Sequence, residues 1–184
     1  MSQYHHCALC EHEQKSLKDG LTCGLTNKKP TFENTCSYIK LDGKFQNKIE
    51  AVTIELERIR RKKYSIHLTY YFLISVGFLL IAGNKKLAEL FHSTMYFWLY
   101  QVEIIGVGIT ILSIAFAKLN SFRNKLKIAN WEKYKIDSAL EKYGISYKAN
   151  IVFEKKFHGM QPVNVSIIYK NWTKKRSETT VMVH

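Results

Sequence analysis

Two apolar stretches of membrane-spanning length, residues 64–83 and 96–117, constrain this chain more than any other feature. An α-helix rises about 1.5 Å per residue, so stretches of about 20 residues cross a hydrocarbon core of about 30 Å. Lys and Arg are dense outside the pair and sparse between its members. The sequence therefore predicts a helical membrane hairpin whose two chain ends lie on one side of the bilayer.

The positions of the basic residues predict which side that is. The loop between the stretches contains only Lys85 and Lys86, so the positive-inside rule places both termini in the cytoplasm. Residues 1–43 lack the apolar core of a cleavable signal peptide, and we expect the first stretch to act as the targeting signal. The flanking basic residues, expected to face anionic lipid headgroups, are Arg58, Arg60, Arg61, Lys62, Lys63, Lys118, Arg123, Lys125 and Lys127.

The net charge of +13 lies mainly in the C-terminal segment. Of the 28 basic and 15 acidic residues, 14 and 5 follow Ala117, which gives this segment a charge of +9. Anionic lipid is its expected partner because the bilayer is adjacent. Nucleic acid is the other candidate and is disfavoured, because the chain carries no recognised nucleic-acid-binding motif.

All four cysteines, Cys7, Cys10, Cys23 and Cys36, lie in the first 36 residues. Cys7 and Cys10 form a C-x2-C knuckle that can direct two thiolates at one ion, and the other two could complete a tetrahedral shell. We therefore expect a structural zinc ion, without an open coordination position for catalysis. Another metal or an iron-sulfur cluster, a pair of disulfides, and unpaired thiols are the alternatives, and a reducing cytoplasm disfavours the disulfides.

The head around these cysteines resembles a short four-cysteine head of small bacterial membrane proteins. The residues that carry the resemblance are Cys7-Ala-Leu-Cys10, Gly20-Leu-Thr-Cys23-Gly-Leu-Thr-Asn27, Lys29-Pro30-x-Phe32 and Cys36. It covers about 40 residues and implies metal binding and a bacterial inner membrane, without implying an activity.

Helical periodicity continues outside the predicted spans. Apolar residues recur in steps of three and four from Phe45 to Ile59, and again from Leu119 to Tyr143. These segments are expected to face each other as an antiparallel helical stalk; the alternative is that each lies on the bilayer surface. After Gly144, residues 147–153 and 163–169 have the composition of two β-strands, and residues 171–184 are expected to be a solvated basic end.

One face of the second span carries polar and small residues, among them Glu103, Thr110 and Ser113. An acidic residue in lipid is costly unless it is paired or hydrated, so this face is expected to meet protein or water. Glu103 could line a multimeric pore, or it could lie near the outer interface and pair with a loop cation. The apolar seam that begins at Leu119 points the opposite way, so the helix must break near Asn120 or its two faces must serve different neighbours.

These observations predict a mainly α membrane protein. Its expected segments are a metal-binding head (1–44), a juxtamembrane helix (45–63), the first span (64–83), an external loop (84–95), the second span (96–117), a cytoplasmic helix (118–144), and a β-hairpin with a basic tail (145–184).

The segments outside the spans do not supply a nucleophile with its base, a phosphate-binding glycine loop or paired catalytic carboxylates. An enzyme is therefore not expected. We expect a membrane-anchored interaction or assembly protein, a homo-oligomer or a subunit of a membrane complex. The alternative is an oligomeric effector that permeabilises the membrane, because residues 45–143 resemble in architecture the SLATT-type two-span effector modules of bacterial conflict systems. An RNA-binding tail is a third possibility.

Overall fold

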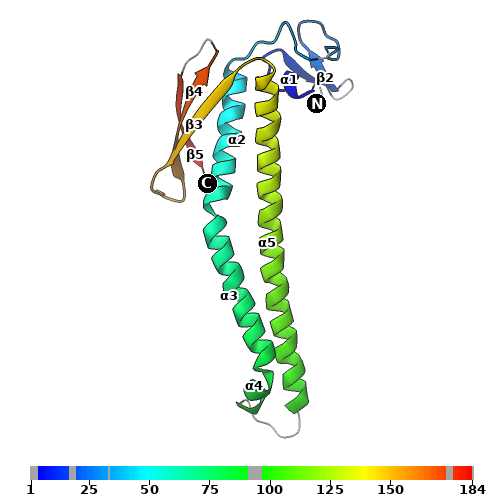
Figure 1. The fold of residues 1–184 in the computed structure, drawn as a ribbon, viewed down its shortest axis with the longest axis vertical. Coiled ribbons are helices and arrows are strands. Elements are labelled where there is room, and N and C mark those ends of the chain that lie inside the picture. The colour runs from blue at the N-terminus through cyan, green and yellow to red at the C-terminus, as the bar shows by residue number, and fades with distance from the viewer. Residues whose placement is uncertain (1–3, 17–19, 33, 91–96, 173–175, 184) are drawn as a thin grey trace. The chain divides into compact units, whose positions relative to one another are not determined.

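The computed structural model describes residues 4–16, 20–32, 34–90, 97–172 and 176–183 (Figure 1). The chain forms two compact units. The first combines Met1–Arg58 with Ile128–His184, and the second is Ile59–Lys127. The first unit is therefore built from both ends of the chain.

The described residues form ten elements, in the order one helix, two strands, four helices and three strands. They are α1 (Tyr4–Cys7), β1 (Glu13–Ser16), β2 (Gly20–Cys23), α2 (Gly43–Arg61), α3 (Lys63–Ala82), α4 (Asn84–Leu90), α5 (Phe97–Glu141), β3 (Ser146–Phe153), β4 (Gln161–Lys170) and β5 (Arg176–Val183).

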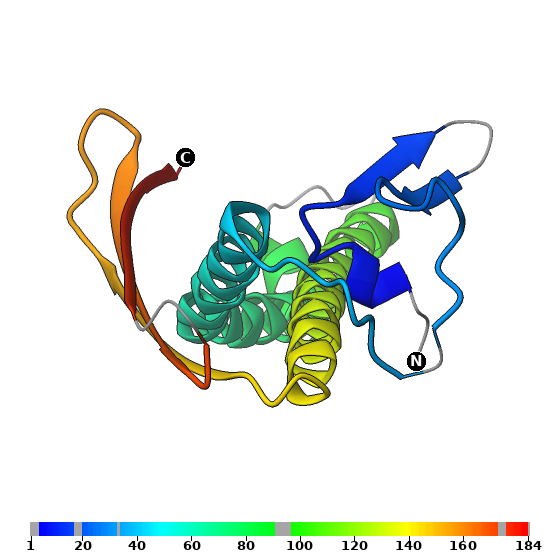
Figure 2. The ribbon, with the colours of Figure 1, turned by 90° about the horizontal axis from the view of Figure 1, so that it is seen from above.

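In the first unit, an antiparallel sheet of order β3-β4-β5 packs one face on α2 (Figure 2). Alternate residues of the central strand β4, from Val163 through Val165 to Ile167, are almost fully buried. In the register, Val165 lies opposite Ile151 of β3 and Thr179 of β5. The side-chain period of two thus gives the sheet one apolar and one solvated face.

The two apolar seams predicted from helical periodicity are confirmed as buried faces. Phe45 and Ile49 of α2 belong to the same core cluster as Ile136 and Leu140 of α5, together with the inner face of the sheet. Because the two helices share this core within one chain, the structure favours the predicted stalk over two helices lying separately on a bilayer.

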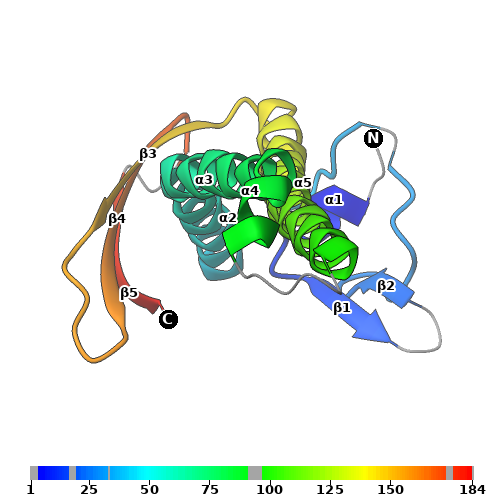
Figure 3. The same ribbon diagram turned by 90° about the horizontal axis from the view of Figure 1, so that it is seen from below.

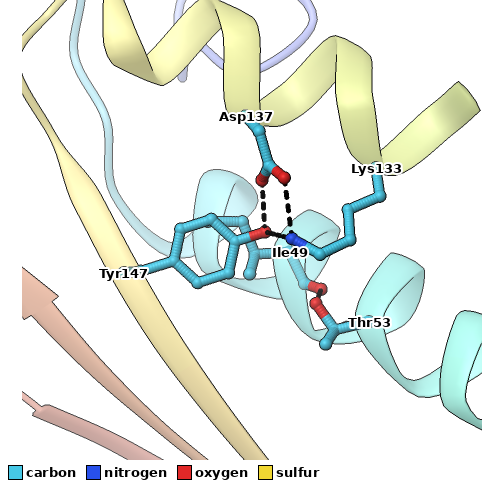
Figure 4. A network of polar contacts seen from close by, with 5 residues as sticks. All are labelled: Ile49, Thr53, Lys133, Asp137 and Tyr147. Carbon is cyan, nitrogen blue, oxygen red and sulfur yellow. Dashed lines mark hydrogen bonds and ion pairs between the residues drawn. The ribbon is translucent and has the colours of Figure 1, made fainter. Parts of the chain in front are cut away.

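A polar cluster ties the first strand of the sheet to α5 (Figure 4). Lys133 Nζ donates hydrogen bonds to Asp137 Oδ2 (2.8 Å) and to the Tyr147 hydroxyl (3.1 Å), and that hydroxyl donates to Asp137 Oδ1 (2.7 Å). Burial, followed by the adjacent Asp137 carboxylate, raises the pKa of Tyr147. We interpret the cluster as structural, because each polar group has a partner.

The second unit contains α3, α4 and the part of α5 that pairs with α3 (Figure 3). Two glycines allow close approach of the helices: a Cβ on Gly77 would lie 2.8 Å from Leu112 Cδ2, and one on Gly108 would lie 2.7 Å from Ile81 Cγ1. Small residues at such contacts are typical of helix packing in membranes.

Two helices are long and apolar enough to cross a membrane, as the sequence predicted. Only 6% and 17% of their most apolar windows are buried, and large side chains such as Phe72, Phe78, Leu79 and Phe116 are exposed. The core helices of a soluble protein would bury most of these side chains.

The structure differs from the predicted segments in three places. Residues 97–141 form one unbroken helix, so the span and the cytoplasmic helix are a single element. Part of the expected external loop forms α4, while residues 91–96 lie outside the described residues. The basic end contains a third strand, β5, because Arg176–Val183 pairs with the free edge of β4.

Candidate functional site

A cavity of about 280 Å³ in the N-terminal head contains the predicted metal ligands. Cys7, Cys10, Cys23 and Cys36 all line it, together with His6 and His12. The head brings them together with three local structures: the turn after α1, the β1–β2 hairpin and the loop that follows β2. All four cysteines are free thiols; Cys7 and Cys10 are buried, and the other two are half-buried.

The thiols influence one another electrostatically. Burial, followed by the nearby Cys36, Cys10 and Cys23 in that order, raises the pKa of Cys7 to about 11. In contrast, hydrogen bonds from the backbone of Leu25 and Thr26 lower the pKa of Cys23 despite partial burial. A divalent cation would relieve the repulsion among four thiolates, because a bound metal inverts the local pKa relationships.

Backbone amides also point at the sulfur atoms. The amide of Lys40 donates to Cys10 Sγ at 3.4 Å, and Cys23 Sγ accepts from the backbone of Leu25. At Cys23 this donor favours the thiolate, which is the form that binds metal. The chemistry of the donor set therefore fits a thiophilic ion such as Zn²⁺.

Within the ranges that the structure describes, no group of three or more His, Cys, Asp or Glu side chains lies close enough together to hold one metal ion. The closed four-thiolate shell that the spacing predicts is thus not formed, although the same four side chains line one cavity. Zinc binding stays a prediction.

The turn that follows α5 contributes a residue to this site that the sequence analysis did not identify. The Tyr143 hydroxyl lies 3.0 Å from His6 Nδ1 and accepts a hydrogen bond from the backbone N–H of Cys36, also at 3.0 Å. The His6 ring packs edge-on against both Tyr143 and Phe32, with centroid separations of 5.5 Å. Because Tyr143 is 107 positions from Cys36, no local pattern could have linked them.

Further contacts hold the head on the rest of the first unit. Leu9, between the two knuckle cysteines, is 2% exposed and belongs to the main core. The Glu11 carboxylate accepts a hydrogen bond of 2.8 Å from the backbone N–H of Lys44, in the first turn of α2, where a negative charge is favourable. Glu13 forms ion pairs with Lys15 and Lys44.

The other predicted site residues lie in or near the second unit. Glu103, Thr110 and Ser113 are exposed, as are Gly106 and Ala117 on the same face of α5, while Gly108 and Ala115 are buried. The Thr110 and Ser113 hydroxyls donate to the carbonyls of Gly106 and Ile109 in their own helix. Leu119 and Phe122 are buried in the unbroken helix, so its two faces serve different neighbours.

The basic residues expected to face lipid headgroups are at the surface. Arg60, Arg61, Lys62 and Lys63 are exposed at the junction of α2 and α3, and Lys118, Arg123, Lys125 and Lys127 are exposed on α5. Arg58 is half-buried and forms an ion pair with Glu55 at 3.7 Å. The partner of this basic set is not established by its exposure alone.

The chain matches no protein-family model, no curated protein and no solved structure. The two resemblances described above therefore stay predictions, and the function has to be inferred from the residues and their geometry.

Proposed function

We propose that this protein is a membrane-anchored interaction protein whose first unit is a cytoplasmic platform held at the inner membrane of a bacterium. The observation that carries the proposal is that both chain ends fold into one compact unit, while the chain between them contains two apolar helices with exposed side chains. A hairpin through the bilayer returns the chain to the side from which it entered. This topology fits both chain ends lying on one side of the bilayer, and the basic residues assign that side to the cytoplasm.

An exposed apolar stripe on α5 supports a role in binding. Ile128, Trp131 and Tyr134 are 61%, 55% and 55% exposed, and the last two rings stack with centroids 5.6 Å apart. Lys135 Nζ lies 5.6 Å from the centre of the Trp131 ring. Exposed aromatic side chains beside a cation are characteristic of interface anchors, so we assign this stripe to a protein partner.

The binding test uses a photoreactive phenylalanine analogue in place of Trp131, in cells that express the whole chain. We expect a cross-linked product of discrete mass, either with a second copy or with another membrane protein. The same analogue at Glu141, exposed on the same helix, is the matched control. If neither position yields a product and the chain purifies as a monomer, the interaction role is wrong.

The head is proposed to bind one structural zinc ion through Cys7, Cys10, Cys23 and Cys36. The common cavity and the N–H donors to sulfur support this assignment. The ion would connect the turn after α1 to the β2 segment and to the loop around Cys36, and would supply folding free energy to a head with little apolar core.

Metal analysis of the purified whole chain tests the zinc proposal. We expect about one zinc per chain, lost in Cys23→Ser and retained in Ser37→Ala, a variant of a nearby residue that also lines the cavity. Visible absorbance with bound iron and sulfide would instead indicate an iron-sulfur cluster. A metal-free chain with a folded head would contradict both.

The polar face of α5 favours a second function, that of an oligomeric effector that permeabilises the membrane. Glu103, Gly106 and Thr110 are exposed, and a Cβ on Gly106 would meet nothing within 4 Å. Because an exposed carboxylate in a span is costly, several copies would gain by joining these faces around water.

Ion flux from liposomes that contain the whole chain distinguishes the two functions. The effector function predicts flux that Glu103→Leu abolishes and Glu89→Leu, in α4, does not. Growth arrest with loss of membrane potential on expression would agree with it. Intact liposomes would leave the platform as the better account.

A further inference from the structure

The turn that joins β3 to β4 holds two apolar side chains in solvent. Phe157 is 72% exposed and Met160 is 39% exposed, and they form an isolated bridge. The Phe157 N–H donates to the Met160 carbonyl at 2.8 Å, and the Met160 N–H donates back at 3.0 Å. His158 and Gly159 between them have φ values of 47° and 82°, as in a tight two-residue hairpin turn. The tip is thus well defined, and its apolar pair does not fold inward.

Two cations stand next to this pair. Lys155 and Lys156 are exposed and immediately precede Phe157. The nearest acidic side chain along the chain, Glu154, accepts a hydrogen bond of 2.6 Å from Asn164 Nδ2 on the outer face of the sheet. An aromatic and a thioether side chain flanked by lysines complement an anionic bilayer surface, in which apolar groups enter the interface and ammonium groups meet phosphates.

Contacts with α2 show which way the hairpin points (Figure 1). Phe45, in the first turns of α2, packs on Trp172 at the open end of the hairpin, with ring centroids 5.1 Å apart. Further along the helix, Glu50 accepts a hydrogen bond of 2.9 Å from Thr179, which is closer to the tip. The direction from the open end to the tip therefore follows α2 toward its C-terminal end.

Chain geometry sets how far the tip extends along α2. Thr179 pairs with Val165, and Met160 lies five residues beyond Val165, which advances about 16 Å along a strand. The same length of α-helix contains about 11 residues, which from Glu50 covers the remainder of α2 within the first unit. The tip therefore lies at the opposite end of the sheet from Trp172.

We propose that the β3–β4 turn, residues 155–160, inserts Phe157 and Met160 into the interface of an anionic bilayer, with Lys155 and Lys156 on lipid phosphates. This inference rests on the proposed membrane anchoring. It gives the first unit an attachment to the membrane in addition to the spans.

Lipid photo-cross-linking of the whole chain tests the inference. A benzoyl-phenylalanine replaces Phe157, and parallel variants carry it at Ile168, 52% exposed near the open end of the sheet, and at Leu79, 67% exposed in α3. Each is reconstituted in vesicles of equal parts phosphatidylcholine and phosphatidylglycerol. We expect lipid adducts at 157 and 79 and essentially none at 168.

Charge reversal supplies the second measurement. Lys155→Glu with Lys156→Glu should lower the adducts at 157 about 10-fold and leave those at 79 unchanged, because each lysine contributes to headgroup attraction. If the analogue at position 79 forms lipid adducts but the analogue at 157 forms no more than the one at 168, the inference is wrong and the membrane anchoring still stands. No adducts at 79 would overturn both. If the analogue at position 157 cross-links to a protein and not to lipid in native membranes, the tip binds a protein partner and the inference is wrong.

Discussion

The Tyr143 hydroxyl accepts a 3.0 Å hydrogen bond from the backbone N–H of Cys36, which joins the turn after α5 to the loop that carries the last predicted metal ligand. Burial is the main reason why the pKa of Tyr143 is raised, so the hydroxyl remains protonated near neutral pH. Tyr143 is therefore a positioning residue for the head: it orders Cys36 on one side and His6 on the other.

Tyr143→Phe should weaken zinc binding about 10-fold or more, because residues that orient metal ligands commonly contribute 10- to 100-fold to affinity. The ring contact with His6 remains in this variant, and only the hydroxyl is removed. Competition with a chromophoric chelator on the purified whole chain gives the affinity. Tyr134→Phe, at an exposed position of α5, is the control, and equal affinities for the two variants would contradict the positioning role.

Thr179→Val should loosen the attachment of β5 to α2. Glu50 is only 6% exposed, and its Oε1 accepts hydrogen bonds from Thr179 (2.9 Å) and Ser177 (3.3 Å). Removing the shorter bond leaves the buried carboxylate with one hydrogen bond fewer and lowers the local stability by about 1 kcal/mol or more. The β5 amides should therefore exchange with deuterium about five-fold faster.

The matched variant for this test is Thr180→Val. Its hydroxyl donates at 2.8 Å to Asn164 Oδ1 on the exposed face of the sheet, where water can replace it. Faster β5 exchange in Thr180→Val than in Thr179→Val would show that the buried contact is not what holds the strand.

Gly108→Val should weaken the pairing of α3 with α5 in detergent micelles. The new side chain would clash with Ile81 and approach the Gly77 carbonyl, which a Cβ would meet at 3.2 Å. Overpacking of this kind costs about 1 to 3 kcal/mol, so the midpoint of heat-induced aggregation should fall. Gly106→Val makes the same change in open space and should leave the midpoint of the monomer unaltered. If it disrupts an oligomer instead, the polar face of α5 is the contact between copies.

Alkaline pH should destabilise the first unit before it ionises the buried tyrosines. Burial raises the pKa of both Tyr147 and Tyr169, with further contributions from Asp137 and Glu50 respectively. A tyrosine whose pKa is higher in the folded than in the unfolded chain binds its proton more tightly when folded. The stability this confers is complete below pH about 10, the unfolded value, and is lost as pH rises above it.

Ultraviolet titration of tyrosinate, combined with unfolding measurements at each pH, checks this expectation. The whole chain has 11 tyrosines, so Tyr169→Phe is needed to identify the late-titrating signal. If that variant loses absorbance change near pH 10, where exposed tyrosines ionise, the buried site does not raise the pKa.

The sequence by itself determined the features that repeat locally. The apolar stretches and the seams through Phe45, Ile49, Ile136 and Leu140 follow from helical spacing, and the buried positions agree with it. The grouping of four cysteines in one short head was also predictable, because a segment of about 40 residues keeps them near one another. Periodicity reports which face of an element is apolar, and burial follows from it.

Only the tertiary structure decided which distant residues meet. Tyr143 joins His6 and Cys36 because the turn after α5 lies against the head, and Glu50 joins Thr179 across 129 positions. The strand β5 has a charged, threonine-rich sequence that indicates a solvated end, and it becomes a strand because the open edge of β4 offers unpaired backbone groups. Such pairings depend on the whole core, and a pattern within ten or twenty residues carries no information about them.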